Sequence, residues 1–167
     1  MKKNIGIMLG LAIVMVSSNA LAHCEIPCGI YGDRMRVEQL REHFRTLEKS
    51  MKKVVELQDA DDINYNQLVR WVNNKELHAN KVQEIVYQYF MNQRITPVEK
   101  GEGAAYESYV EQLTLLHKML VQAMKTKQTT DLEHIENLRE LLDGFEDAYF
   151  EDKEEKGGHG HGHGHQH

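Results

Sequence analysis

The amino-acid sequence predicts an all-α protein that folds as an antiparallel four-helix bundle. Apolar residues recur at alternating three- and four-residue spacing in four separate segments, which is the pattern of amphipathic helices. The connections between these segments are short, and the chain has 2 prolines, Pro27 and Pro97. No segment alternates apolar and polar residues as a half-buried strand does, so four packed helices are the expected architecture.

Two stripes of apolar residues predict the first two helices. The first stripe runs from Val37 to Val55, and Asp33 is expected to be the N-cap of its helix. Residues 58–62 interrupt the spacing, and the second stripe then runs from Tyr65 to Phe90. Both stripes are expected to face the core. Their members are Val37, Leu40, Phe44, Leu47, Met51, Val54, Val55, Tyr65, Leu68, Val69, Val72, Ala79, Val82, Ile85, Val86, Tyr89 and Phe90.

The remaining two helices follow a connection that contains Pro97 and the glycines at 101 and 103. The third stripe extends from Tyr106 to Met124. Residues 130–133, Thr-Asp-Leu-Glu, match a capping box and predict the start of the fourth helix, whose stripe ends at Tyr149. The predicted bundle therefore spans residues 32–156.

The first 22 residues have the pattern of a secretory signal peptide. Two lysines precede an apolar run from Ile5 to Val16, and Ala20-Leu21-Ala22 forms an A-x-A cleavage site. The apolar run is shorter than the about 20 residues that a membrane-spanning helix needs. We therefore expect an exported protein, periplasmic or secreted, with no membrane attachment after removal of the signal.

The charge balance argues against a nucleic-acid partner. The chain has 20 Lys and Arg residues against 26 Asp and Glu residues, a formal net charge of −6. Loss of Lys2 and Lys3 with the signal makes the mature chain more acidic still. Nucleic-acid binding needs a basic face, and an anionic substrate gains no overall attraction from this charge.

Cleavage after Ala22 brings an unusual set of donors together at the new N-terminus. The α-amine of His23, the backbone amide of Cys24 and the thiolates of Cys24 and Cys28 are able to form a square, with the His23 imidazole as an axial ligand. Square ligation by nitrogen and sulfur favours Ni(II) or Cu(II) over Zn(II), which prefers a tetrahedron. The C-x-x-x-C spacing alone favours a disulfide or an incidental pair.

Residues 23–31 resemble the nickel hook of the nickel superoxide dismutases, whose mature N-terminus reads His-Cys-x-x-Pro-Cys-Gly-x-Tyr. The matching residues are His23, Cys24, Pro27, Cys28, Gly29 and Tyr31. The chain departs from the family at Glu25, where Asp is usual, and at Gly32-Asp33, where Asp-Pro is usual. Neither departure removes a donor.

The resemblance implies a superoxide dismutase with one nickel ion per chain. It implies that superoxide is converted to oxygen and hydrogen peroxide by cycling between Ni(II) and Ni(III), and that the bundles assemble as a homohexamer. His23, Cys24 and Cys28 would hold the metal, and Tyr31 would control access to it. The family also has a Glu and an Arg that orient the axial imidazole, and Glu38 and Arg70 are the expected counterparts here.

The last eleven residues, 157–167, combine glycines with alternating histidines, a composition that is typical of a disordered metal-binding tail. The tail histidines are His159, His161, His163, His165 and His167. They favour a competing hypothesis, in which the protein is a periplasmic nickel or copper carrier without catalysis. A third hypothesis is a disulfide-stapled helical interaction module.

Four histidines fall within the predicted helices and are not expected to bind metal. Di-metal sites in helical bundles use Glu-x-x-His pairs, and none occurs in these helices. The four imidazoles are therefore expected to be surface or partly buried groups. They belong to His43, His78, His117 and His134.

Overall fold

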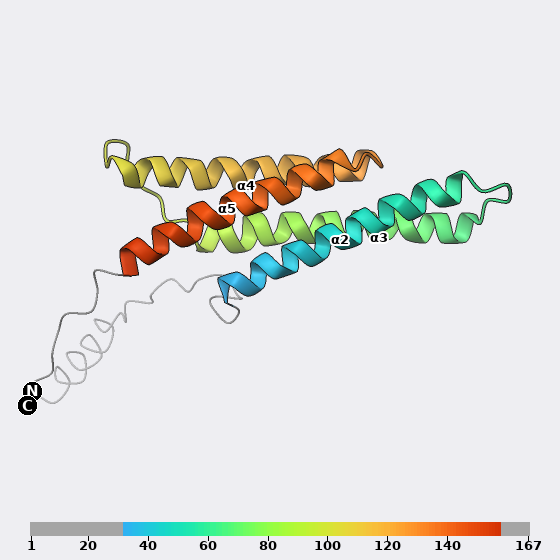
Figure 1. Ribbon diagram of the computed structural model, residues 1–167, viewed down its shortest axis with the longest axis horizontal. Helices are drawn as coiled ribbons and strands as arrows, with labels where there is room; N and C mark the ends of the chain where they lie inside the picture. Colours follow the sequence, from blue (N-terminus) through green and yellow to red (C-terminus); the bar gives the residue numbers. More distant parts are fainter. Residues whose placement is uncertain (1–31, 158–167) are drawn as a thin grey trace, which may run out of the picture.

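The computed structural model describes residues 32–157, with side chains described as far as Glu151. Within this range the chain forms an antiparallel bundle of four helical rods, which confirms the predicted all-α fold (Figure 1). The predicted signal peptide, the hook and the histidines of the tail lie outside the described residues. No helix within the described range is long and apolar enough to cross a membrane.

The rods pack as two antiparallel pairs. The first pair is α2, Asp33–Gln58, with α3, Tyr65–Glu84, which continues directly into the π-helix η1, Ile85–Met91. The second pair is α4, Ala104–Gln128, with α5, Glu133–Gly157. The N-terminal end of α2 and the C-terminal end of α5 lie at the same end of the bundle (Figure 1).

The core is built from the predicted stripes, and aromatic side chains dominate it near the start of α2. The ring of Phe90 packs edge-on against Phe145 and Tyr149, with centroid distances of 5.0 and 5.7 Å. Tyr89 also meets Phe90 edge-on, at 5.1 Å. Edge-to-face contacts of this kind contribute roughly 0.5–1.5 kcal/mol each beyond the burial of area.

The predicted burial is wrong at the far end of the first pair. Tyr65 is 69% exposed and Val69 is 55% exposed, although both belong to the second apolar stripe. The reason is the offset of the two pairs along the bundle, because α2 and α3 extend beyond the turn that joins α4 to α5 (Figure 1). No helix of the second pair is present there to cover the stripe.

Two of the predicted helix starts are also wrong. Gly32 is the N-cap of α2, and Asp33 lies in the first turn with its carboxylate engaged elsewhere. The capping box at Thr130 does not form. Instead the Asp131 carboxylate accepts a hydrogen bond of 3.0 Å from the backbone N–H of Glu133.

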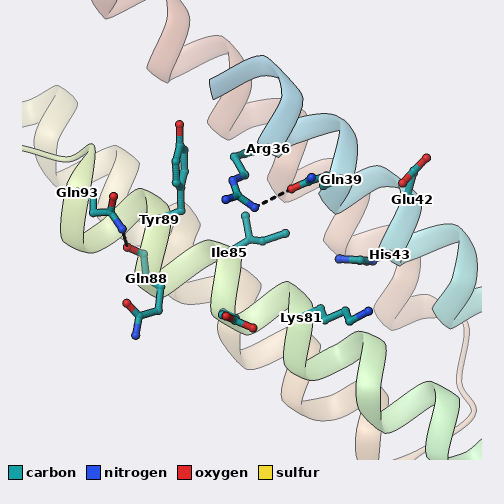
Figure 2. Close-up of a pocket in the computed structure, with 10 residues that line it drawn as sticks. Arg36, Gln39, Glu42, His43, Lys81, Ile85, Gln88, Tyr89 and Gln93 are labelled. Atoms are coloured by element: carbon teal, nitrogen blue, oxygen red, sulfur yellow. Dashed lines mark hydrogen bonds between the residues drawn. The ribbon is translucent and has the colours of Figure 1, made fainter. Parts of the chain in front are cut away.

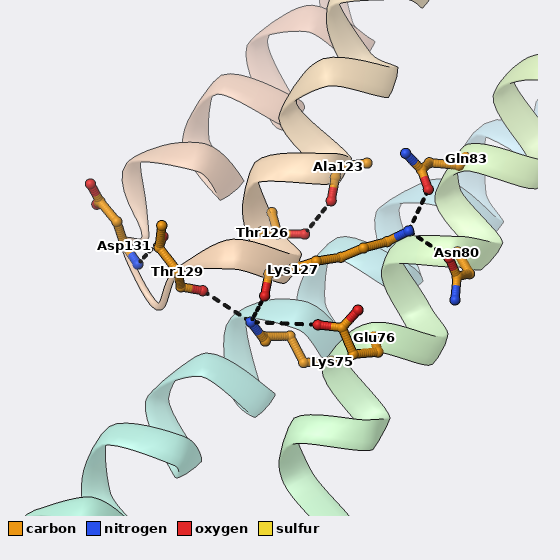
Figure 3. Close-up of polar contacts among 9 residues, drawn as sticks. All are labelled: Lys75, Glu76, Asn80, Gln83, Ala123, Thr126, Lys127, Thr129 and Asp131. Carbon is orange, nitrogen blue, oxygen red and sulfur yellow. Dashed lines mark hydrogen bonds and ion pairs between the residues drawn. The ribbon is translucent and has the colours of Figure 1, made fainter.

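A buried lysine joins the first pair to the end of α4. Lys75 is 5% exposed, and its Nζ donates to the backbone oxygens of Lys127 and Thr129, at 2.6 and 3.2 Å (Figure 3). These carbonyls are among the last of α4 and have no partner inside the helix. Burial lowers the pKa of Lys75, while Glu76, 3.9 Å away, opposes that shift.

Candidate metal centre and its anchor

The donors of the hook precede the described residues directly, so the structure shows where the hook joins the bundle. Tyr31 is followed by Gly32, the N-cap of α2. Among the residues that the structure describes, no group of three or more His, Cys, Asp or Glu side chains is arranged to hold a metal ion. The thiols and backbone amides of residues 23–28, with the α-amine that cleavage after Ala22 would free, would be donors of the types that fit nickel.

Asp33, two residues after Tyr31, is held by two hydrogen bonds and an ion pair from distant parts of the chain. Tyr89 and Tyr149 donate their hydroxyls to the two carboxylate oxygens, at 2.6 and 2.9 Å. Arg94 Nε lies 2.9 Å from Oδ1, and Arg94 Nη2 donates to the Tyr89 hydroxyl at 3.0 Å. We call these four residues the Asp33 network. It ties the first turn of α2 to η1, to the segment after η1 and to α5.

The π-helix places Tyr89 in this network. In η1 the backbone N–H of Asn92 bonds to the oxygen of Tyr87, five residues back, where an α-helix would use a residue four back. The wider turn changes the direction of the side chains that follow Ile85. As a result Tyr89 and Phe90 both become buried, and the Tyr89 hydroxyl reaches Asp33.

The electrostatics of the Asp33 network keep it intact at neutral pH. Burial, together with the Asp33 carboxylate, raises the pKa of both Tyr89 and Tyr149, so each hydroxyl keeps the proton that it donates. The hydrogen bond to Tyr89 and the charge of Asp33 raise the pKa of Arg94. The Asp33 side chain is 15% exposed and that of Arg94 is 23% exposed, so their ion pair is partly shielded from water.

A groove of about 500 Å³ runs from the Asp33 network along α2 and the α3–η1 rod (Figure 2). Tyr89 stands at one end and His43 at the other. On the α2 side, Arg36 Nη1 donates to Gln39 Oε1 at 2.8 Å. The groove is open to solvent and its wall is largely polar.

The structure places the two expected orienting residues apart. Glu38 is exposed on α2. Arg70 lines a separate hollow of about 330 Å³ with Thr46 and Trp71. At 1.5 Å per residue, Thr46 lies roughly 12 Å further along α2 than Glu38. The orienting role of these two residues stays a prediction, and the described structure does not bring them together.

Sequence analysis missed the Asp33 network. Asp33 was assigned a local capping role, and Arg94 gave no signal of its own. Tyr89 and Tyr149 were recognised as core or interface residues, without their shared partner.

The fold and the donor chemistry together define a small helical metalloprotein with its donors ahead of the first helix. The family of nickel-containing superoxide dismutases matches residues 18–153, a range that includes residues 23–31, the first three rods and α5 as far as residue 153. The chain belongs to this family, so it is an oxidoreductase that acts on superoxide and uses nickel. Searches of curated proteins and of solved structures gave no match.

Proposed function

We propose that the mature chain begins at His23 and binds one nickel ion through residues 23–28. The proposal is carried by one observation, that the family match extends over the hook, from residue 18 onward. The bound nickel supplies a one-electron couple between Ni(II) and Ni(III). The ligands on this chain would be the His23 amine and imidazole, the Cys24 amide and the thiolates of Cys24 and Cys28.

The donor types suit dismutation of superoxide. The metal's reduction potential must lie between the potentials of the two half-reactions, and hydrated nickel is far too difficult to oxidise. Anionic thiolates and a deprotonated amide donate charge and lower the potential, and the His23 imidazole adds a further donor. Tyr31 is the expected gate, since its phenol is able to order water near the ligands and limit access.

We further propose that the Asp33 network positions the hook. Asp33 begins α2 directly after the hook, and three side chains hold its carboxylate. A fixed first turn limits the positions that residues 23–31 can reach. Export to the periplasm or the medium and assembly into a homohexamer are parts of the same proposal, and they rest on the signal-like segment and on the family.

The test is superoxide decay and metal content measured on the same purified samples, all beginning at His23. Cys24→Ser and Cys28→Ser should each abolish activity, because a serine hydroxyl forms an anionic donor far less readily than a thiol. His23→Ala should still bind nickel through the remaining donors but lose turnover. Tyr31→Phe should be milder than any of these.

A chain that retains Ala22 before His23 is the sharpest control. It keeps every side chain but removes the α-amine from the correct position, so activity should disappear while the fold survives. Full nickel-dependent activity in this chain would contradict the proposed ligand set. Wild-type turnover in His23→Ala would remove the imidazole from the redox role.

The tail supports a second candidate role, which is to collect nickel for the hook. Its five imidazoles are nitrogen donors of the type that nickel, copper and zinc prefer. Truncation after Lys156 should leave turnover of the fully loaded enzyme unchanged and slow loading at scarce nickel. Equal loading of the full-length and the truncated chain at scarce nickel would remove this role.

The competing hypothesis is a nickel or copper carrier without catalysis. It predicts no superoxide decay by the metal-loaded protein.

A further inference from the structure

Two histidines from neighbouring helices meet at the end of the groove opposite the Asp33 network. His43 lies on α2 and His78 on α3, and their Nδ1 atoms are 3.1 Å apart. The ring centroids are 5.0 Å apart and the ring planes are inclined by 70°. Both side chains are half-buried. The ligand set proposed for the hook does not include this pair.

The pair is uncharged at neutral pH. Burial, with the neighbouring His78 and Lys81, lowers the pKa of His43 to about 4. Burial and Lys81 also lower the pKa of His78. One ring therefore donates its Nδ1–H to the bare Nδ1 of the other. Neutral imidazole is the form of histidine that binds metals.

The spacing of the two nitrogens matches the spacing of neighbouring ligands around one metal ion. Metal–imidazole bonds of about 2.0–2.1 Å place adjacent nitrogens about 2.9 Å apart at a right angle and about 3.4 Å apart at a tetrahedral angle. The observed 3.1 Å lies between these values. We propose that His43 and His78 form a second metal site, separate from the hook, for a divalent ion of the zinc, nickel and copper group.

Binding needs only a small rearrangement of the pair. The two Nδ1 lone pairs must turn toward a common point, and the terminal torsion of histidine is broad enough to allow it. The donating ring moves its proton from Nδ1 to Nε2 through water, so no net proton is released. Both rings then bind through Nδ1.

Water completes the coordination shell. Within the described part of the chain no third His, Cys, Asp or Glu joins the pair. Figure 2 shows Glu42, the carboxylate next to His43 in the chain, pointing away from the imidazole. The groove gives water access to His43. Lys81 also lines it, and its positive charge opposes a cation, so the long side chain has to swing aside.

A metal ion bound at His43 and His78 would stabilise the fold. A metal held by His43 and His78 cross-links α2 to α3 at the middle of the first pair. Because such an ion binds only the folded chain, it raises the free energy of unfolding as its concentration rises above the dissociation constant. This effect is independent of superoxide turnover.

The decisive experiment adds Zn(II) to the nickel-loaded mature chain, which begins at His23. Anomalous diffraction at the zinc edge should show a peak within bonding distance of both Nδ1 atoms. In solution, His43→Gln and His78→Gln should each bind one zinc ion fewer per chain than the wild type. His134→Gln is the matched control, since the Nδ1 of His134 lies 3.0 Å from Gln122 Oε1 and has no imidazole partner. This variant should keep the wild-type stoichiometry.

A second measurement covers the case in which a Gln variant folds poorly. Zinc added to the wild type labelled with ¹⁵N-histidine should shift the Nδ1 resonances of His43 and His78. Either of two results would overturn the site: no zinc peak at the pair, or unchanged zinc stoichiometry in both folded Gln variants. Zinc seen in crystals with no loss of stoichiometry in solution would also overturn it.

Discussion

The two ends of the α2–α3 pair are built differently. At the end next to the hook, the Asp33 network and the rings of Phe90, Phe145 and Tyr149 are enclosed by all four rods. At the opposite end, which we call the tip, Tyr65 and Val69 are exposed on α3. Side-chain contacts that join the two pairs are therefore present at the end that adjoins residues 23–31.

The tip is held by local contacts between α2 and α3. Asn64 caps α3 by accepting from the backbone N–H of Gln67, at 3.1 Å. Further in, Asn74 donates to the Ser50 hydroxyl at 2.9 Å. These contacts lie within one helix pair, whereas the Asp33 network joins both pairs. The two ends of the first pair therefore differ in what holds them, which is contacts within one pair at the tip and contacts between both pairs at the other end.

Substitution of Asp33 should produce the largest effect. Asp33→Asn removes the charge that Arg94 and two tyrosines surround, and hydrogen bonds to charged groups contribute about 1.5–3 kcal/mol each. We expect a loss of about 2–3 kcal/mol in the free energy of unfolding, measured with urea. We also expect reduced superoxide turnover at equal nickel content.

The matched control for Asp33 lies toward the tip. Glu56→Gln breaks an exposed ion pair with Lys53 on α2. Exposed pairs contribute about 0–1 kcal/mol, so this variant should stay close to the wild type. Equal losses in the two variants would contradict the difference between the ends.

Lys75→Met should have the next largest effect, because Lys75 is a point where the first pair meets the end of α4. The substitution leaves the carbonyls of Lys127 and Thr129 without their buried donor, at a cost of about 1–3 kcal/mol. Lys127→Met should cost less. Its partners are the side-chain oxygens of Asn80, which is exposed, and of Gln83, whose amide nitrogen also donates to the Leu120 carbonyl, so less is left unpaired (Figure 3). A reversed order of these two losses in urea unfolding would contradict this account.

Acid should weaken the middle of the first pair through His43. The folded pKa of about 4 lies below the ordinary value of 6.5, so the unfolded chain binds the proton first as pH falls. Stability is therefore full above pH 6.5 and decreases toward pH 4. In metal-free protein His43→Gln should flatten this slope, measured by urea unfolding across the range. His117→Gln, which removes an exposed imidazole, is the control, and equal slopes in the two variants would contradict the prediction.

The smallest effect on folding is expected at the tip. Tyr65→Ser with Val69→Ser removes apolar groups that are already exposed, so the free energy of unfolding should change by no more than about 0.5 kcal/mol. If the tip contacts other subunits, the assembly should nevertheless become smaller in sedimentation velocity. Leu77→Ser, at a residue that is 50% exposed on the same helix, is the control. Unchanged assembly in the double variant would exclude the tip as a contact.

Helical periodicity was sufficient to predict the fold. Buried residues such as Leu40, Val82 and Leu138 follow the spacing directly, because a helix must bury one face. The spacing did not predict the exposed tip. Exposure of Tyr65 depends on how far the two pairs are offset along the bundle, which the spacing of apolar residues within one helix does not determine.

The Asp33 network and the pair of His43 and His78 could not be predicted from local patterns in the sequence. Asp33 has the sequence context of an N-cap, but its partners at Tyr89 and Tyr149 are 56 and 116 residues away. His43 and His78 are 35 residues apart, and only the packing of α2 on α3 brings their rings together. By contrast, the hook donors of residues 23–28 are contiguous, so their chemistry is readable from the sequence.

The π-helix η1 has a consequence for how the chain tolerates insertion and deletion. Each residue advances an α-helix by about 100°, so the wider turn of η1 acts as one extra residue that shifts the helical phase. The side chains from Tyr65 to Glu84 follow one continuous α-helical periodicity. The directions of Tyr89 and Phe90 are shifted from that periodicity by the extra residue of η1. Deleting a single residue of η1 ahead of Tyr89 would remove the extra residue, restore a continuous α-helix and leave Tyr89 directed toward Asp33. This turn is therefore the place where the α3–η1 rod can lose one residue and keep the Asp33 network, while α3 itself remains in register.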